Sequence, residues 1–356
     1  MPQLVALDLP GGPEFVEQLQ RIWDAGDAAF PVDQRLPSAA KRALIEEMGC
    51  GRQPVDPGDA VVVATSGSSG APKGVVLTHE SLAASAEATS RRLGVTEDDH
   101  WLACLPLSHV GGLSVVTRAL HMATRLTVLP GFDSDLVDAS DASLVSLVAT
   151  ALQRIDASRF RKIVLGGSRP PADRPANVVI TYGMTETGSG VVYDRTPLDG
   201  VDVRIVDGEI QVRGPMLLRC YRSGVDPKSS DGWLPTGDLG DMDESGMLDV
   251  HGRRDELIIT GGENVWPEQI EAVLRSHERV ADVAVGGRAD PDWGEVVVAY
   301  VVPADRSDPP SLASLRDHVK RQAPAYQAPR HVVYVDDIPR TAVGKVQRVK
   351  LSNRLE

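Results

Sequence analysis

The chain has 356 residues, 42% of them hydrophobic, and carries a formal net charge of −13. This length exceeds what one hydrophobic core comfortably serves, so we expect a globular protein of two domains. The acidic balance argues against nucleic acids and anionic membrane surfaces as partners, because both would repel the protein.

The cysteines and the apolar segments indicate the compartment. Cys50, Cys104 and Cys220 are far apart and form no C-x-x-C pair, which predicts a reducing compartment without disulfides or a metal cluster. The N-terminus lacks a basic segment followed by an apolar one, and no 18 uncharged apolar residues run together. We therefore expect a cytoplasmic location and no integral membrane association.

The first 59 residues are rich in proline, glycine and aspartate and carry no motif. Two helices are predicted there, over residues 13–25 and 38–48. A buried-strand run follows at residues 60–64, and a second apolar run begins at residue 75. The residues between these two runs are therefore predicted to form the turn of a hairpin.

That turn reads T-S-G-S-S-G-A-P-K-G and has the composition of a phosphate-binding loop. Its glycines let backbone N–H groups approach an anion, its hydroxyls donate hydrogen bonds, and Lys73 adds a positive charge. The register of a Walker A loop fails, because a glycine and a strand follow Lys73. A flexible linker is the other alternative, but two valine-rich strands flank the loop. The predicted phosphate ligands are Thr65, Ser66, Gly67, Ser68, Ser69, Gly70 and Lys73.

Strands and helices are predicted to alternate after the loop. Thr78 is a suitable N-cap for a helix over residues 79–93, which Gly94 would end. Ligand-binding loops follow the strands of such α/β proteins, so we expect the site at the strand ends. The predicted strands cover residues 101–105, 126–129, 161–165 and 178–181.

The pattern changes after residue 200. Short β segments with a turn at Asp207-Gly208 predict a small β subdomain, and α+β segments follow from residue 257. We therefore predict an N-terminal domain over residues 1–252 and a C-terminal domain over residues 253–356. The predicted strands cover residues 201–206, 209–212, 247–250, 257–260, 280–287 and 296–302, and the predicted helices cover residues 267–276 and 311–322.

The phosphate loop resembles the signature [ST]SG[ST]TGxPKG of the adenylate-forming superfamily, which includes acyl-CoA synthetases, nonribosomal peptide adenylation domains and luciferases. Five further segments resemble the successive core motifs of that superfamily. They are residues 105–112 (LPLSHVGG), 182–187 (YGMTET), 236–238 (TGD), 252–255 (GRRD) and 339–345 (PRTAVGK). The resemblance covers roughly residues 60 to 350.

The superfamily implies an α/β fold, with a large N-terminal domain of layered α/β sheets, a small β subdomain and a small mobile α+β C-terminal domain. The N-terminal part is shorter here than is usual, so we expect the contacts of one subdomain to be missing. In the implied reaction a carboxylic acid attacks the α-phosphorus of ATP, and the thiol of coenzyme A then attacks the acyl-adenylate. ATP, Mg²⁺ and coenzyme A are therefore the implied cofactors and co-substrate.

The resemblance also assigns the nucleotide contacts. Lys73 and the loop hydroxyls would hold the β- and γ-phosphates, and Glu186 would hold Mg²⁺. Asp238 would accept hydrogen bonds from the ribose hydroxyls, and Arg253 would contact the ribose or the phosphates. Without the motifs, these would be ordinary loop carboxylates and turns. Further nucleotide contacts are implied for Gly166, Gly167, Ser168, Tyr182, Gly183 and Thr185, with Tyr182 stacking on adenine.

The resemblance also implies two residues in the conformational change between adenylation and thioester formation. Lys345 resembles the lysine that reaches the α-phosphate and the substrate carboxylate during adenylation. Asp255 matches the hinge position, where a backbone rotation would swing the C-terminal domain between two catalytic poses. In the second pose, a thiol tunnel would be lined by residues 261–264. An ordinary C-terminal tail and a surface aspartate are the alternatives.

The acid pocket is predicted around His109, Gly111 and Gly112. Acyl- and aryl-CoA ligases carry an aromatic residue and a histidine at this place, although a serine takes the aromatic position here. Arg118 follows in an apolar run, where charge is costly unless paired. Here the sequence resembles o-succinylbenzoate-CoA ligases of menaquinone synthesis, in which an arginine at this offset would clamp the second carboxylate of the acid. A structural histidine and an arginine that reaches the surface or pairs with a protein acid are the alternatives.

The sequence therefore predicts an ATP- and Mg²⁺-dependent acid–CoA ligase, with o-succinylbenzoate as the favoured acid. A ligase for another aryl or fatty acid, an adenylation enzyme that loads a carrier protein and a non-catalytic nucleotide-binding relative remain as alternatives. The intact Lys73, Glu186, Asp238 and Lys345 weigh against the last of these. The oligomeric state is left open, a homodimer included.

Overall fold

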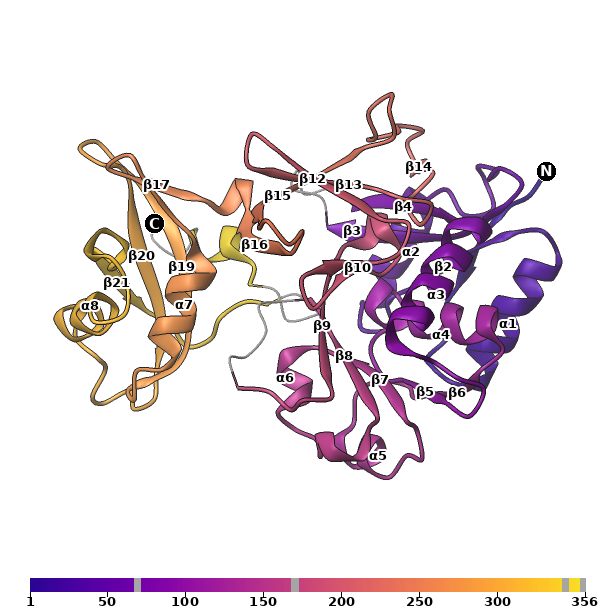
Figure 1. Cartoon of the computed structure of the whole chain (residues 1–356), viewed down its shortest axis with the longest axis horizontal. Helices are drawn as coiled ribbons and strands as arrows, with labels where there is room; N and C mark the ends of the chain where they lie inside the picture. Colours follow the sequence, from indigo (N-terminus) through magenta and orange to yellow (C-terminus); the bar gives the residue numbers. More distant parts are fainter. Residues whose placement is uncertain (67–71, 168–172, 341–345, 353–356) are drawn as a thin grey trace. The chain divides into compact units, whose positions relative to one another are not determined.

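The computed structural model describes residues 1–66, 72–167, 173–340 and 346–352 (Figure 1). The chain divides into two compact units, which we describe one at a time. Unit 1 comprises Met1–Arg204, Gln211–Pro235 and Met242–Leu248, and unit 2 comprises Ile205–Ile210, Thr236–Asp241 and Asp249–Glu356. The fold is mixed α/β, as the sequence predicts, and the domain boundary at residue 252 stays a prediction.

The phosphate loop belongs to the first sheet of unit 1, whose strand order is β1-β2-β3-β4-β14. Strands β3 and β4 are antiparallel, with Thr65 opposite Lys73, so the predicted hairpin is confirmed. Strands β1 and β2 were not predicted, because four-residue apolar runs do not distinguish a strand from a buried helix segment. The strands are β1 Leu4–Leu7, β2 Ala28–Pro31, β3 Asp59–Ser66, β4 Pro72–Thr78 and β14 Cys220–Tyr221, and the helices are α1 Pro13–Asp24 and α2 Ser38–Glu47.

The second sheet of unit 1 has the order β11-β10-β9-β8-β7-β5-β6. Its strands from β6 to β9 are parallel, and β10 and β11 add an antiparallel edge. The predicted motif segments follow the ends of β5, β8 and β9, which is where parallel sheets place ligand loops. The strands are β5 His100–Ala103, β6 Arg125–Val128, β7 Leu144–Leu147, β8 Lys162–Leu165, β9 Val178–Gly183, β10 Gly190–Tyr193 and β11 Thr196–Pro197.

Helix α3, His79–Leu93, confirms its predicted capping residues. Thr78 and Ser81 form a reciprocal capping box, and Gly94 ends the helix with a left-handed φ of 59°. Helix α4, Val110–Met122, packs against α3 and β5, and its buried residues are 112–119. The remaining helical segments of unit 1 are α5 Ser134–Asp138, α6 Ala149–Leu152, η1 Ala157–Arg159 and η2 Thr185–Thr187.

A third sheet has the order β12-β13-β15-β16. The predicted turn between its first two strands is confirmed by left-handed φ values of 51° at Asp207 and 77° at Gly208. The motif at residues 236–238 lies within β15, and not in the turn that is the ordinary alternative for a Gly-Asp pair. The strands are β12 Asp202–Val206, β13 Glu209–Arg213, β15 Leu234–Met242 and β16 Leu248–Arg253.

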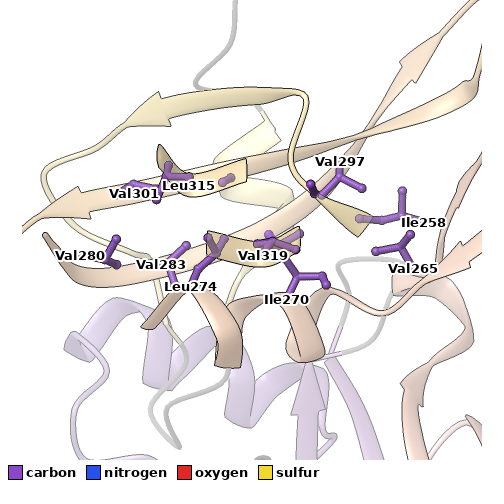
Figure 2. Packing of buried hydrophobic residues seen from close by; sticks show 13 residues of the cluster. Ile258, Val265, Ile270, Leu274, Val280, Val283, Val297, Val301, Leu315 and Val319 are labelled. Carbon is purple, nitrogen blue, oxygen red and sulfur yellow. The ribbon is translucent and has the colours of Figure 1, made fainter. Parts of the chain in front are cut away.

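The main sheet of unit 2 has the order β18-β17-β20-β19, and β21 pairs with β20. Figure 2 shows Ile270 and Leu274 of α7 and Leu315 and Val319 of α8 among the apolar side chains of its core. The elements are η3 Arg254–Glu256, β17 Ile258–Thr260, β18 Glu263–Val265, α7 Pro267–Arg275, β19 Val280–Asp290, β20 Gly294–Pro303, α8 Leu312–Lys320, η4 Ala325–Gln327, β21 His331–Tyr334 and α9 Arg348–Ser352. None of the described helices in either unit combines the length and the apolar character needed to span a bilayer.

Candidate active site

Two sequence-predicted residues of unit 1, Lys73 and Glu186, meet at the side chain of Tyr221. The Tyr221 hydroxyl donates a hydrogen bond to Oε1 of Glu186 at 3.0 Å. The Nζ atom of Lys73 lies 5.2 Å from the centroid of the same ring. Lys73 stands on β4, Glu186 on η2 and Tyr221 on β14, so three distant segments converge on one side chain.

Sequence reasoning missed Tyr221. It lies in the segment R-C-Y-R, which carries no recognised catalytic spacing. Its place follows from strand pairing, because β14 is antiparallel to β4 with Tyr221 opposite Val75, two residues after Lys73. A backbone hydrogen bond from the segment that precedes β14 also holds Glu186, since Leu218 N donates to the Glu186 carbonyl oxygen at 2.7 Å.

The base of the phosphate loop is closed by Thr65, whose Oγ1 donates to the carbonyl oxygen of Lys73 at 3.4 Å. Ser66 is the last residue of β3 and pairs with Pro72. The tip of the loop is outside the described residues, so its predicted phosphate contacts stay predictions. The loop residues concerned are Gly67, Ser68, Ser69 and Gly70.

Three glycines that are predicted to contact the nucleotide, Gly166, Gly167 and Gly183, have structural reasons to be glycine. A Cβ on Gly183 would stand 2.2 Å from the carbonyl oxygen of Ser189, so β9 and β10 can approach only with glycine there. A Cβ on Gly166 would stand 2.8 Å from Oγ1 of Thr181, and Gly167 has a left-handed φ of 88°. These contacts explain the glycines structurally and leave their nucleotide role a prediction. Ser168 lies outside the described residues.

Tyr182 and Thr185 flank the turn that carries Glu186. Tyr182 is a half-buried residue of β9 opposite Val192, and Thr185 begins η2. The backbone N–H of Met184 donates to Oγ1 of Thr187 at 2.9 Å, and that hydroxyl donates to the carbonyl oxygen of Ser189 at 2.6 Å. This short hydrogen-bonded turn holds Glu186 rigidly after the strand.

His109, the N-cap residue of α4, contacts a part of the chain in which the sequence showed no motif. Its Nε2 lies 3.1 Å from Nη2 of Arg35 and 3.9 Å from Oδ2 of Asp33, and Arg35 and Asp33 form an ion pair at 2.7 Å. Burial, with Arg35 beside the ring, lowers the pKa of His109 despite the opposing effect of Asp33. The imidazole is therefore held in its neutral form near pH 7.

Arg118 is buried in α4, with only 2% of its surface exposed. Its guanidinium carbon lies 4.8 Å from the centroid of the Trp101 ring on β5. In the part of the chain that the structure describes, its Nε and Nη1 have no hydrogen-bond partner. Burial lowers the pKa of Arg118, although Tyr193 acts in the opposite sense. A cation with unused donors in such a place is expensive unless it binds an anion.

In unit 2, Arg253 joins the predicted ribose aspartate and the predicted hinge aspartate. Its Nη1 lies 3.3 Å from Oδ1 of Asp238 and donates to the carbonyl oxygen of Thr236 at 2.9 Å, and its Nε donates to Oδ1 of Asp255 at 3.2 Å. Burial would lower the pKa of Arg253, but the two carboxylates outweigh it and raise that pKa. Asp238 is thereby held on β15 by Arg253, and its carboxylate oxygens can accept hydrogen bonds.

Lys345 lies outside the described residues, but the chain on both sides of residues 341–345 is held in unit 2. Arg340 and Val346 form an antiparallel β-bridge, and Gln347 N donates to the carbonyl oxygen of Pro339 at 2.8 Å. The Arg340 guanidinium binds both carboxylate oxygens of Asp282, at 2.8 and 2.9 Å.

The possible metal ligands among the described residues suit Mg²⁺ better than a metal ion that needs several protein ligands. Among the described residues, no group of three or more histidine, cysteine or acidic side chains could hold a metal ion. Mg²⁺ is commonly held by one or two carboxylates together with waters and substrate phosphates. Glu186, a half-buried carboxylate beside the phosphate hairpin, fits that arrangement.

The chain is similar to known proteins along most of its length. The sequence pattern described as AMP-binding enzyme matches residues 49–222, and that described as AMP-binding enzyme C-terminal domain matches residues 269–345. A Mycobacterium tuberculosis protein named probable 2-succinylbenzoate–CoA ligase is 38% identical over 98% of both chains. The chain belongs to the AMP-binding enzyme family.

Two solved structures of a family member, o-succinylbenzoate CoA synthetase (MenE) from Bacillus subtilis, resemble this fold. The complex with the acyl-adenylate intermediate OSB-AMP has a TM-score of 0.88 at 29% identity and covers 98% of this chain and 88% of that chain. The complex with ATP and magnesium ion has a TM-score of 0.87 at 29% identity and covers 98% and 89%. The predicted fold class, with a large N-terminal domain and a small C-terminal domain, is that of MenE.

Proposed function

We propose that this member of the AMP-binding enzyme family is an acid–CoA ligase that converts o-succinylbenzoate, ATP and coenzyme A into o-succinylbenzoyl-CoA, AMP and pyrophosphate. The similarity to 2-succinylbenzoate–CoA ligases supports the reaction class. The observation that carries the choice of acid is the buried Arg118 with free donors at Nε and Nη1 among the described residues. The cytoplasmic location, the homodimer and the domain boundary at residue 252 are proposed with it.

Arg118 suits an acid that has a second carboxylate. Adenylation uses one carboxylate of o-succinylbenzoate, so the other must be desolvated in the pocket. An arginine binds a carboxylate through two parallel hydrogen bonds, and its donors would satisfy both partners. Arg118 is nine positions after His109, the N-cap residue of α4, which corresponds to about 13 Å along the helix axis. Arg118 would therefore bind the remote end of the acid, and His109, Gly111 and Gly112 would border the reacting end.

The remaining residues would stabilise and position the nucleotide. Lys73 and the hairpin hydroxyls would bind the β- and γ-phosphates, and the Asp238 carboxylate would accept hydrogen bonds from the ribose. Gly166, Gly167, Ser168, Tyr182, Gly183 and Thr185 would surround adenine. Glu186 would hold Mg²⁺, which when bound neutralises charge on the phosphate oxygens.

Two steps would use unit 2 differently. The ammonium of Lys345 would stabilise the negative charge that develops at the α-phosphate during adenylation. A rotation at Asp255 would then withdraw Lys345 and admit coenzyme A, whose thiolate attacks the acyl-adenylate carbonyl and releases AMP.

The proposal is tested with the purified protein, ATP, Mg²⁺ and coenzyme A. Pyrophosphate release is measured over a panel of o-succinylbenzoate, benzoates, fatty acids and amino acids, and products are identified by mass. The expected product is o-succinylbenzoyl-CoA. If the protein turns over only another acid, it is a ligase for another aryl or fatty acid. If it forms an acyl-adenylate but no coenzyme A thioester, it is an adenylation enzyme that loads a carrier protein.

Substituting Arg118 tests the choice of acid. Arg118→Leu should lower kcat/KM for o-succinylbenzoate by roughly 30- to 1,000-fold, about 2–4 kcal/mol, because the remote carboxylate loses its partner. An analogue without the remote carboxylate should be spared. Arg154→Leu is the matched control, since Arg154 also stacks on an aromatic ring, Phe132 at 5.0 Å, but is exposed. Equal losses on both acids would assign Arg118 to stability alone.

A further inference from the structure

Tyr221 contacts two residues that the proposed function assigns to the nucleotide. Its hydroxyl is the donor to Glu186 at 3.0 Å, and its ring faces the Lys73 ammonium at 5.2 Å. One side chain therefore orients a carboxylate and a cation through two different parts of its structure. We propose that Tyr221 is a positioning residue for ATP and its metal ion, acting through Glu186 by its hydroxyl and through Lys73 by its ring.

The backbone around Tyr221 supports such a role. Strand β14 pairs with β4 through Cys220 opposite Val76 and Tyr221 opposite Val75, and Arg222 N donates to the carbonyl oxygen of Gly74 at 2.6 Å. These bonds fix Tyr221 beside the strand that carries Lys73. The aromatic ring has two side-chain torsions, so little freedom remains once the backbone is held.

A second set of contacts, made by Arg219, anchors the segment that leads into β14. Arg219 binds the buried carboxylate of Asp59 through two hydrogen bonds of 2.8 Å, and the Arg219 N–H donates to the carbonyl oxygen of Val76 at 2.9 Å. Asp59 begins β3, so the strand that leads into the phosphate loop and the strand that carries Tyr221 are tied together. Tyr221 therefore keeps its place without help from Glu186 or Lys73.

The hydroxyl would restrict Glu186 in a specific way. It donates to Oε1, which restricts the movement of the carboxylate. A carboxylate held before the metal ion arrives loses less freedom on binding, so the affinity for the metal–nucleotide complex rises. The ring would act on Lys73 differently, because attraction between an ammonium and an aromatic face restricts the long lysine side chain near the phosphates. The first effect depends on the metal ion, whereas the second does not.

The dependence on the metal ion therefore distinguishes the two effects, and the test rests on the proposed function. Binding of ATP is measured by calorimetry, once with saturating Mg²⁺ and once with EDTA. Tyr221→Phe removes only the hydroxyl and should weaken binding about tenfold with Mg²⁺. In EDTA its affinity should equal that of the wild type. Tyr221→Leu removes the ring as well and should weaken binding in EDTA by about two- to fivefold. The melting temperature of each variant without nucleotide serves as the folding control.

A double-mutant cycle separates positioning from a general effect on the fold. In a Glu186→Gln background, Tyr221→Phe should cause no further loss of Mg²⁺-dependent affinity, because residue 186 then lacks the carboxylate that the hydroxyl would orient toward the metal ion. The inference would be overturned if Tyr221→Phe still lowered the ATP affinity in the Glu186→Gln background. It would also be overturned if Tyr221→Phe alone left the ATP affinity unchanged both with Mg²⁺ and with EDTA. A wild-type protein that binds no ATP would instead overturn the proposed function. Should Tyr221→Leu fail to fold, Tyr221→Phe and the cycle still decide the role of the hydroxyl.

Discussion

Gly111 and Gly112 are neighbours in the first turn of α4, but only Gly112 is required by its surroundings. A Cβ on Gly112 would lie 2.4 Å from the carbonyl oxygen of Leu105 and 2.6 Å from that of Pro106. A Cβ on Gly111 would meet only Cδ1 of Leu105, at an ordinary 3.7 Å. The helix therefore packs onto the loop that carries His109 through Gly112, whereas this packing does not require a glycine at position 111.

This difference gives a matched pair of variants. Gly112→Ala should lower the free energy of unfolding by about 1–3 kcal/mol, because the new methyl group collides with backbone that cannot turn aside. Gly111→Ala should be neutral or stabilise the protein by up to about 1 kcal/mol, since alanine favours a helix over glycine. Urea denaturation of both variants measures the difference. Equal effects would mean that the loop can move away from α4.

At the scale of elements, Arg348 connects α9 to three other segments of unit 2. Its guanidinium binds Glu256 of η3 at 2.9 Å, Glu271 of α7 at 2.7 Å and the carbonyl oxygen of Val285 on β19 at 2.9 Å. The Glu271 side chain is 3% exposed and also accepts from Val285 N at 2.9 Å. Burial, opposed by Arg348, raises the pKa of Glu256. The arginine thus offsets the cost of two carboxylates held away from water.

Arg348→Met should destabilise unit 2 by about 3–5 kcal/mol, because Glu271 would stay buried after losing its main cation. Arg275→Met is the matched control at the same carboxylate. Its guanidinium is 3.3 Å from Glu271 and its side chain is 43% exposed, so a loss of about 0–1 kcal/mol is expected. Hydrogen exchange of the β19 amides reports the stability of this unit in both variants. Similar protection in both would show that Glu271 is satisfied without Arg348.

For the whole molecule, a substitution at the predicted hinge and one at the predicted catalytic lysine should each slow a different half-reaction. Lys345→Ala should slow adenylation by about 100- to 1,000-fold, because it removes a charge aimed at the transition state, and should spare coenzyme A attack on supplied acyl-adenylate. Asp255→Pro should spare adenylation and slow thioester formation, since proline fixes φ.

Asp255→Ala controls for the ion pair with Arg253, which both Asp255 variants lose. It should retain both half-reactions, because alanine leaves the backbone free to rotate. Rapid-quench measurement of each half-reaction separates the three variants. Parallel losses of both steps in Lys345→Ala, or thioester formation unchanged in Asp255→Pro, would place the control of the two steps elsewhere.

Features that depend on local pattern could be predicted from the amino-acid sequence. The hairpin around Lys73, the capped helix after Thr78 and the turn at Asp207-Gly208 follow from periodicity, capping and backbone preferences that act over a few residues. The order of the motifs identified the superfamily and the acid–CoA ligase chemistry. The sequence also drew attention to Arg118, because burying an arginine within an apolar run is energetically unfavourable unless the charge is paired.

The meeting of side chains from distant segments is visible only in the folded protein. Tyr221 joins Lys73 and Glu186 through the pairing of β14 with β4, and Arg35 and Asp33 meet His109 from a region without motifs. It also shows that Arg118 is buried beside Trp101 with free donors among the described residues. Contacts of this kind depend on strand order and packing between residues far apart in sequence, which no local pattern encodes.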